Sequence, residues 1–218
     1  MRSRAAGAAG LERDVSLVVS LYDRSGIMVM PWAEAGYECI CYDIQHSIRR
    51  DRVKGNVTYR WADARSLTAS DIGRPAIVFA FPPCTNLAVS GARDFQRKGL
   101  RGLIDGLELV EAARQLCENS GAPWMLENPV SRLSSCWRKP DYTFDPCDYG
   151  DPYTKRTCLW TGSGFRMPPK RRVEPAAGSA MHLVPPGPDR ANVRSATPNG
   201  FARAVFAANA AYVREGAA

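Results

Sequence analysis

Short apolar runs separated by polar turns dominate the chain from residue 15 onward. Continuous runs rich in Val, Ile and aromatic residues are typical of strands that are buried on both faces. They predict five strands, at residues 15–22, 37–42, 57–61, 77–81 and 124–126, and a further strand at residues 157–160.

Helical segments alternate with these strands. Residues 27–35 predict a helix that Gly36 can end, and residues 100–119 carry apolar side chains at helical spacing. Residues 67–72 predict a short helix or turn, and the Ala-rich residues 202–213 predict a last helix. This alternation indicates an α/β fold with a mostly parallel central sheet and helices on both faces.

The remaining stretches have no hydrophobic period. Residues 131–153 predict a long ordered loop, and the Pro- and Arg-rich residues 165–196 predict an irregular segment. Residues 1–14 indicate a flexible tail without the apolar core of a signal peptide. We therefore expect one main domain at residues 15–164, completed by a C-terminal helix within residues 197–218.

Composition narrows the class of protein. The net charge of +7 is compatible with a polyanionic partner, although basic side chains are also common on solvated surfaces. No apolar run is long enough for a membrane span. Seven cysteines without a secretory signal favour a reducing, cytoplasmic location, and their spacing predicts no metal site. The basic residues cluster at Arg49, Arg50, Arg52 and Lys54, at Arg93, Arg97, Lys98 and Arg101, and at Lys170, Arg171 and Arg172.

Polar or reactive residues follow or end five of the predicted strands. They are Asp23, Asp43, Asp63, Cys84 and Glu127. The carboxyl ends of parallel strands meet at one edge of a sheet, so we expect these side chains to face one cleft. Each also has a structural interpretation: an Asp can cap a turn, a Cys can be a small core residue, and a Glu can lie on the surface.

The first strand, turn, helix and second strand form a unit that ends at Asp43. The spacing from Asp23 to Asp43 is typical of a nucleotide-binding βαβ unit, whose acid binds ribose hydroxyls. The usual triplet of glycines is absent, so only Gly26 supports the turn.

Cys84 and Glu127 suit one kind of chemistry. Pro82 and Pro83 stiffen the turn that carries Cys84. A thiolate adds to a ring carbon only if the ring can accept the electrons, and a carboxyl that protonates a ring nitrogen makes this possible. Cytosine fits, with sulfur at C6 and the carboxyl at N3. C5 then becomes a nucleophile that needs a one-carbon donor such as S-adenosylmethionine.

A family resemblance agrees with this chemistry. Residues 15–160 resemble the cytosine-C5 DNA methyltransferases, as a compact phage-type member, and residues 197–205 are similar to the closing cofactor motif. The resemblance implies a Rossmann-like S-adenosylmethionine-dependent methyltransferase fold, a flipped cytosine in DNA as substrate, and a monomer. The motifs occur in family order as Asp23-Arg-Ser-Gly26, Tyr42-Asp43-Ile44, Phe81-Pro-Pro-Cys84, Leu126-Glu-Asn-Pro129 and Thr154-Lys-Arg-Thr157.

The resemblance also implies roles for individual residues. Cys84 would be the attacking thiolate, Glu127 would hold the base at N3, and Lys155 or Arg156 would position the same ring. The implied cofactor-binding residues are Tyr22, Asp23, Ser25, Gly26, Asp43, Ile44, Asp63, Ala64, Phe81, Asn199 and Phe201. The implied substrate-binding residues are Pro83, Thr85, Asn86, Asn128, Pro129, Arg93, Arg171 and Arg172.

The sequence departs from the family pattern in four places. The glycine turn is shortened, and Thr85 stands where the family has glutamine. The family's Gln-x-Arg-x-Arg strand is reduced to Thr154-Lys-Arg-Thr157, and residues 165–196 replace a large target-recognition domain. Short or relaxed sequence specificity is the expected result. Two alternatives stay open: a cytosine-C5 enzyme acting on a free cytidine nucleotide or RNA, and a catalytically inactive DNA-binding protein of the same fold.

Overall fold

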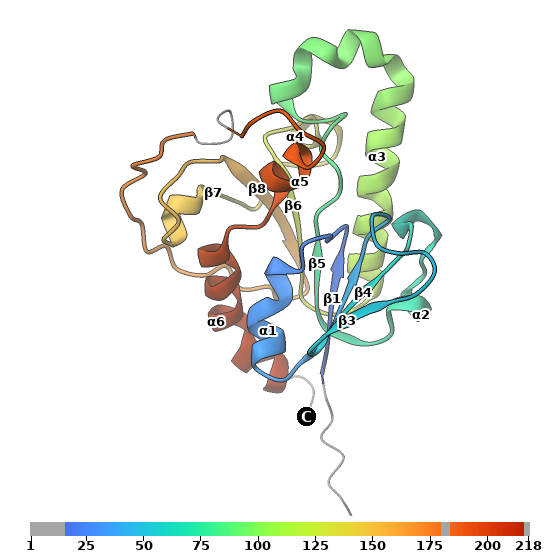
Figure 1. The fold of residues 1–218 in the computed structure, drawn as a ribbon, viewed down its shortest axis with the longest axis vertical. Coiled ribbons are helices and arrows are strands. Elements are labelled where there is room, and N and C mark those ends of the chain that lie inside the picture. Colours follow the sequence, from blue (N-terminus) through green and yellow to red (C-terminus); the bar gives the residue numbers. More distant parts are fainter. Residues whose placement is uncertain (1–15, 180–183, 216–218) are drawn as a thin grey trace, which may run out of the picture.

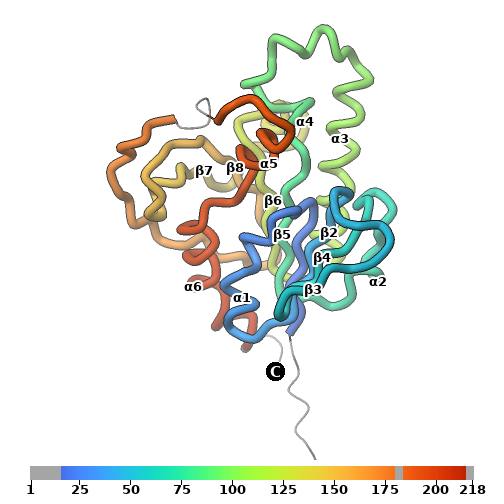
Figure 2. The backbone as a smooth tube through the Cα atoms, in the orientation of Figure 1, coloured from blue at the N-terminus to red at the C-terminus, as the bar shows by residue number. Residues whose placement is uncertain are grey.

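A single mixed sheet forms the centre of the protein (Figures 1 and 2). The computed structural model describes residues 16–179 and 184–215, so the predicted tail at residues 1–14 lies outside the described residues. The sheet has eight strands in the order β3-β4-β2-β1-β5-β6-β8-β7. The strands are β1 (Leu17–Leu21), β2 (Glu38–Tyr42), β3 (Arg52–Lys54), β4 (Val57–Arg60), β5 (Pro75–Ala80), β6 (Trp124–Pro129), β7 (Tyr142–Phe144) and β8 (Thr157–Gly162).

The five central strands are parallel, as the sequence predicts. Parallel pairing joins the neighbouring strands in the order β4, β2, β1, β5 and β6. β1 has β2 on one side and β5 on the other, so the order in which the chain adds strands to the sheet reverses at β1. In open α/β sheets, ligands bind outside the carboxyl ends of the strands at such a switch point. β8 is antiparallel to β6, so the amino end of β8 lies at the same edge as the carboxyl ends of the parallel strands.

Helices cover both faces of the sheet. Successive strand residues alternate between two cores: Phe79 faces α1 (Met30–Glu34) and α6 (Asn199–Glu215), whereas Val78 faces α3 (Phe95–Asn119). Trp32 of α1 makes an edge-to-face contact with Phe206 of α6, with ring centroids 5.1 Å apart. Figure 1 shows α1 beside α6, and α3 on the other side of the sheet. The predicted two-sided α/β fold is confirmed.

Smaller elements complete the two layers. Ile27–Val29 (η1) is a 3-10 turn that leads into α1, and Ala64–Ser66 (η2) and α2 (Ala69–Ile72) follow β4. η3 (Val89–Asp94) lies between the Cys84 turn and α3. The backbone of Gly99 (φ 62°, ψ −162°) breaks α3 near its start, in a conformation open only to glycine.

Two predictions of irregular structure were incomplete, and one strand was not predicted. Residues 131–153 contain α4 (Leu133–Cys136), β7 and η4 (Pro146–Tyr149). Residues 165–196 contain α5 (Arg190–Ser195). Residues 52–54, which the sequence analysis treated only as part of a basic cluster, form the edge strand β3. Each element is shorter than the window over which a hydrophobic period can be recognised.

Candidate active site

Cys84 lies in a tight turn beyond the carboxyl end of β5. The carbonyl oxygen of Cys84 accepts hydrogen bonds from the backbone N–H groups of Leu87 (2.9 Å) and Ala88 (2.8 Å). Pro82 is buried, whereas the cysteine itself keeps part of its surface exposed. The turn therefore holds the thiol in a fixed position that a substrate can reach.

Glu127 lies on β6, which pairs in parallel with β5. The residue keeps some exposed surface, but its Oε1 is enclosed and has no hydrogen-bond partner within the described residues. Burial raises the pKa of the carboxyl, and the nearby Lys155 ammonium opposes this effect. A carboxyl with a raised pKa keeps its proton to a higher pH than an exposed carboxyl, and in the protonated form it can donate a hydrogen bond to a ligand.

Asn128 ties the two strands together at the site. Its Nδ2 donates a hydrogen bond to the carbonyl oxygen of Pro82 at 3.0 Å, and the side chain is fully buried. Its Oδ1 is also enclosed without a partner in the part of the chain that the structure describes. The next residue, Pro129, ends β6.

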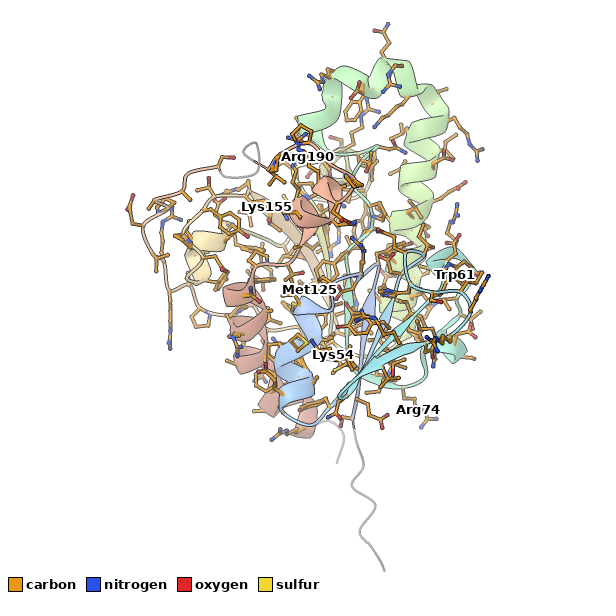
Figure 3. The ribbon with its side chains drawn as sticks, in the orientation of Figure 1. Lys54, Trp61, Arg74, Met125, Lys155 and Arg190 are labelled. Carbon is orange, nitrogen blue, oxygen red and sulfur yellow. The ribbon has the colours of Figure 1, made fainter. Side chains whose placement is uncertain are left out.

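Lys155 and Arg156 precede β8 but lie in different surroundings. Lys155 lines the pocket that contains Glu127, and its backbone N–H donates to Asp145 Oδ1 at 3.0 Å (Figure 3). Arg156 is exposed, and its Nη1 lies 3.5 Å from Asp145 Oδ2. Of these two cations, Lys155 is therefore the one beside the carboxyl of Glu127.

One pocket joins segments that are far apart in the sequence. Phe81 follows β5, Glu127 lies on β6, and Phe201 is in α6, where it stacks on Phe144 with ring centroids 4.1 Å apart. The full lining is Phe81, Glu127, Phe144, Lys155, Thr157, Ser195, Thr197, Pro198 and Phe201. Four predicted site residues thus share one pocket.

The thiol of Cys84 is subject to opposing effects. Burial is the largest and raises its pKa, and the negative charge of Glu127 adds to the increase. The positive charges of Lys155 and Arg194 act in the opposite direction. Because the pKa of the thiol depends on the charge of Glu127, protonation of that carboxyl favours the thiolate.

The Asp23 side chain is the anchor of the glycine turn. Its Oδ1 accepts hydrogen bonds from the backbone N–H of Gly26 (2.7 Å) and from Ser25 Oγ (3.0 Å), and its Oδ2 accepts one from Ser20 Oγ (2.8 Å). Gly26 has φ +71°, and a Cβ there would lie 2.6 Å from the hydroxyl oxygen of Tyr59. Asp23 therefore shapes the turn from within.

Asp43 and Ile44 follow β2. Asp43 is buried, its Oδ1 accepts from the backbone N–H of Gln45 (2.7 Å), and burial raises the pKa of the carboxyl. Ile44 is 61% exposed, which is unusual for so large an apolar side chain. His46, which the sequence analysis missed, contacts the carbonyl oxygen of Asp23 through Nε2 at 3.1 Å.

Asp63, Ala64 and Tyr22 border the same edge. Asp63 begins η2 and pairs with Arg65, as in the N-cap interpretation, and these contacts lower the pKa of the carboxyl. Ala64 is buried. Tyr22 adopts a left-handed conformation (φ 58°), and its hydroxyl donates to the carbonyl of Leu109 in α3.

The remaining predicted site residues do not line the pocket that contains Glu127. Pro83, Thr85 and Arg93 are exposed, Asn86 is half-buried, and Lys98 Nζ donates to the carbonyl oxygen of Thr85 at 2.6 Å. Asn199 is exposed at the start of α6. Arg171 is also exposed. Arg172, together with Lys170, pairs with the buried carboxylate of Asp148 at 2.6 Å and 2.8 Å.

The described residues contain no group of three or more His, Cys, Asp or Glu side chains that could hold a metal ion. Within the same residues, every helix is too short or too polar to cross a membrane.

No family model and no curated protein matches the sequence. Solved structures of methyltransferases share part of the fold. The antibiotic-resistance methyltransferase Kmr is 15% identical over 51% of this chain and 57% of its own, with a TM-score of 0.30. The aminoglycoside resistance methyltransferase NpmB1 is 18% identical over 56% of this chain and 60% of its own, with a TM-score of 0.33.

The glycopeptide N-methyltransferase MtfA is 15% identical over 69% of this chain and 66% of its own, with a TM-score of 0.32. This chain thus spans less than two thirds of the length of these three proteins. The strand order and the parallel pairing of the central strands confirm the predicted Rossmann-like α/β fold. The similarities are weak, so the case for a particular reaction has to come from the side chains of the site.

Proposed function

We propose that the protein is a DNA cytosine-C5 methyltransferase that uses S-adenosylmethionine and a covalent adduct of Cys84. The observation that carries this proposal is the unpartnered, enclosed Oε1 of Glu127 beside Lys155 and the strand that leads to Cys84. A buried oxygen without a partner costs about 1–3 kcal/mol, and a ligand that bonds to it removes this cost.

The reaction is assigned to this chain's own residues. The thiolate of Cys84 bonds to C6 of the cytosine, while the carboxyl of Glu127 donates its proton to N3 and so neutralises the ring. After C5 has gained the methyl group, the C5 proton passes to solvent water and the thiolate leaves C6. N3 returns its proton to Glu127, and the aromatic ring is restored. Lys155 holds the carboxyl of Glu127 and the base in position.

The edge formed by the ends of β1, β2 and β4 fits the cofactor. Gly26 leaves space in this turn, because a Cβ at this position would come into close contact with the Tyr59 side chain. Asp43 offers a buried carboxylate for ribose hydroxyls, and the exposed side chain of Ile44 offers an apolar surface for adenine. When bound there, S-adenosylmethionine supplies an electrophilic methyl group. Tyr22, Ser25, Asp63, Ala64, Phe81, Asn199 and Phe201 complete the proposed cofactor site.

The target base has to leave the duplex to reach Cys84, which costs a few kcal/mol. Phosphate contacts from exposed basic residues such as Arg93 and Arg171 would offset this cost. Pro83, Thr85, Asn86, Asn128 and Pro129 are the proposed neighbours of the base.

Methyl transfer to DNA tests the proposal. The protein is incubated with labelled S-adenosylmethionine and, separately, duplex DNA, single-stranded DNA, RNA or dCMP, and the modified cytosines are mapped. We expect transfer to DNA and loss of at least about 10³-fold in rate for Cys84→Ser. Equal activity of Cys84→Ser would refute the assignment. Transfer only to RNA or dCMP would replace DNA as the substrate.

A second probe isolates the covalent step. DNA in which 5-fluorocytosine replaces cytosine cannot lose a C5 proton after methylation, so the bond between Cys84 and C6 should persist. We expect a protein–DNA adduct that survives denaturation and that Cys84→Ser does not form.

A further inference from the structure

Helix α5 (Arg190–Ser195) lies over the pocket that contains Glu127. Ser195, at the end of α5, lines this pocket, as do Thr197 and Pro198 just beyond it. Figure 3 labels Arg190 and Lys155 in the same region of the molecule. The segment that follows the irregular Pro- and Arg-rich stretch thus returns directly to the proposed reaction centre.

The start of α5 is joined to the glycine turn. Asp189 is the N-cap residue of α5, and its Oδ1 lies 2.9 Å from Nη1 of Arg24 in the Asp23–Gly26 turn. α5 therefore reaches from the proposed cofactor site at one end to the pocket of Glu127 at the other.

Two side chains of α5 are available to a nucleic acid strand. Arg194 is exposed and forms no ion pair or hydrogen bond with another described residue through its guanidinium. Its positive charge is near enough to Cys84 to lower the pKa of the thiol. Val193 is 55% exposed at the same turn of the helix. A free cation beside an exposed apolar side chain is suited to a phosphate and the base next to it.

Two of the other basic residues after β8 are less available. Lys170 and Arg172 both bind the buried carboxylate of Asp148, so their charges already stabilise the fold. α5 does not carry such an internal partner for Arg194.

We propose that α5 is the element that reads DNA beside the target cytosine: Arg194 binds a phosphate that flanks the target nucleotide, and Val193 contacts the adjacent base. This inference rests on the proposed function, because it takes DNA as the substrate. It assigns recognition to one short helix, which limits selectivity to the base next to the target.

The test compares Arg194→Ala, Arg194→Lys and Val193→Ala with Arg74→Ala. Arg74 is exposed just before β5, at the opposite end of the molecule from α5, so its replacement removes the same charge without touching the site (Figure 3). Binding to a fluorescent DNA oligonucleotide is measured by anisotropy over a series of NaCl concentrations. The sequence around each methylated cytosine is mapped in the same variants.

For Arg194→Ala we expect weaker DNA binding by about 5- to 20-fold and a salt slope lower by about 0.9, which corresponds to one phosphate contact. Arg194→Lys should keep the salt slope, and Arg74→Ala should match the wild type. Val193→Ala should keep the slope but flatten the preference for the base adjacent to the target.

Two outcomes would overturn the inference. One is a salt slope for Arg194→Ala equal to that of the wild type and Arg74→Ala. The other is an unchanged adjacent-base preference in Val193→Ala. The binding measurement does not require methyl transfer. If the wild type methylates DNA but Arg194→Ala binds DNA as the wild type does, the inference about α5 is contradicted and the proposed reaction is not. A wild-type protein that binds DNA through Arg194 but transfers no methyl group contradicts the proposed reaction instead.

Discussion

The side-chain amide of Asn128 donates a hydrogen bond to the carbonyl oxygen of Pro82 at 3.0 Å. Asn128 directly follows Glu127 on β6, and Pro82 precedes Cys84 in the turn after β5. The bond therefore sets the position of the proposed nucleophile relative to the proposed acid. Two strands alone could not do this, because the turn leaves the sheet before it reaches Cys84.

Replacement of Asn128 by Ala should separate the two groups. We expect kcat to fall by about 10²-fold, since a displacement of about 1 Å in a reacting group has such an effect. The free energy of unfolding should fall by about 1–3 kcal/mol because the Pro82 carbonyl loses its partner. The affinity for S-adenosylmethionine, measured by calorimetry, serves as the control and should not change. An unaltered kcat in a destabilised protein would mean that the bond is only structural.

Removal of the Glu127 charge should make the thiol of Cys84 more reactive. The carboxylate raises the pKa of this thiol, so Glu127→Gln should lower that pKa and speed alkylation by iodoacetamide at pH 7–8. The measurement is made in a Cys136→Ser background, because Cys136 is an exposed thiol. Methyl transfer should nevertheless be lost, since the amide cannot protonate N3. Slower alkylation of the variant would show that the two groups do not interact.

The same variant should be more stable than the wild type at neutral pH. Burial raises the pKa of Glu127 in the folded state, so the folded protein holds its proton more tightly than the unfolded chain. The resulting stability is complete below the ordinary Glu pKa of about 4.3 and is lost as pH rises through the folded pKa. We expect Glu127→Gln to raise Tm at pH 8 by roughly 2–4 °C, which is about 1 kcal/mol.

This difference should shrink toward pH 4, where the wild-type carboxyl is protonated in both states. Melting curves recorded between pH 4 and pH 9 measure it. A difference in Tm that does not depend on pH would contradict the raised pKa of Glu127.

Gly26→Ala should disrupt the proposed cofactor site. The new Cβ would have to adopt φ +71° and would lie 2.6 Å from the Tyr59 hydroxyl. Gly36→Ala is the matched control, because Gly36 also has a positive φ (+92°) but no atom within 4 Å of the added Cβ. Both variants should lose about 1 kcal/mol of stability from backbone strain. Only Gly26→Ala should bind S-adenosylmethionine at least about 10-fold more weakly, as measured by calorimetry.

Arg171 and Arg172 should have different roles despite their adjacent positions. Arg172→Ala removes one of the two cationic partners of the buried Asp148 carboxylate, so it should lower the free energy of unfolding. Arg171→Ala should leave stability nearly unchanged but reduce the salt slope of DNA binding. Denaturant melts and anisotropy titrations separate the two effects. A reversed pattern would assign the phosphate contact to Arg172.

The sequence predicted the central sheet well because each buried strand carries its own signal. The apolar runs around Val19, Val78 and Leu126 are long enough to identify strands, and parallel pairing then brings their carboxyl ends together. This reasoning predicts that Asp43, Cys84 and Glu127 lie at one edge of the sheet. It could not show that β8 runs in the opposite direction, because direction depends on pairing and not on local composition.

The internal contacts of the site were less accessible to sequence reasoning. The sequence suggested that Asp23 binds the cofactor, yet its carboxylate is occupied by hydrogen bonds from Ser20 on β1 and from Ser25 and Gly26 in the turn. His46 gave no signal, because a single histidine after a strand has no pattern. The choice between Lys155 and Arg156 also needed coordinates, since it depends on Asp145, which lies on another segment.

The break in α3 at Gly99 has a consequence for the position of the proposed nucleophile, Cys84. With the chain reversed there, Lys98 can reach the Thr85 carbonyl and brace the turn of Cys84. Any other residue at position 99 would favour a straight, uninterrupted helix and would carry Lys98 away from that carbonyl. The position of the proposed nucleophile would then depend on the shape of a helix that does not contact the base. Preorganisation of Cys84 could therefore be lost while every group that takes part in bond formation stays unchanged.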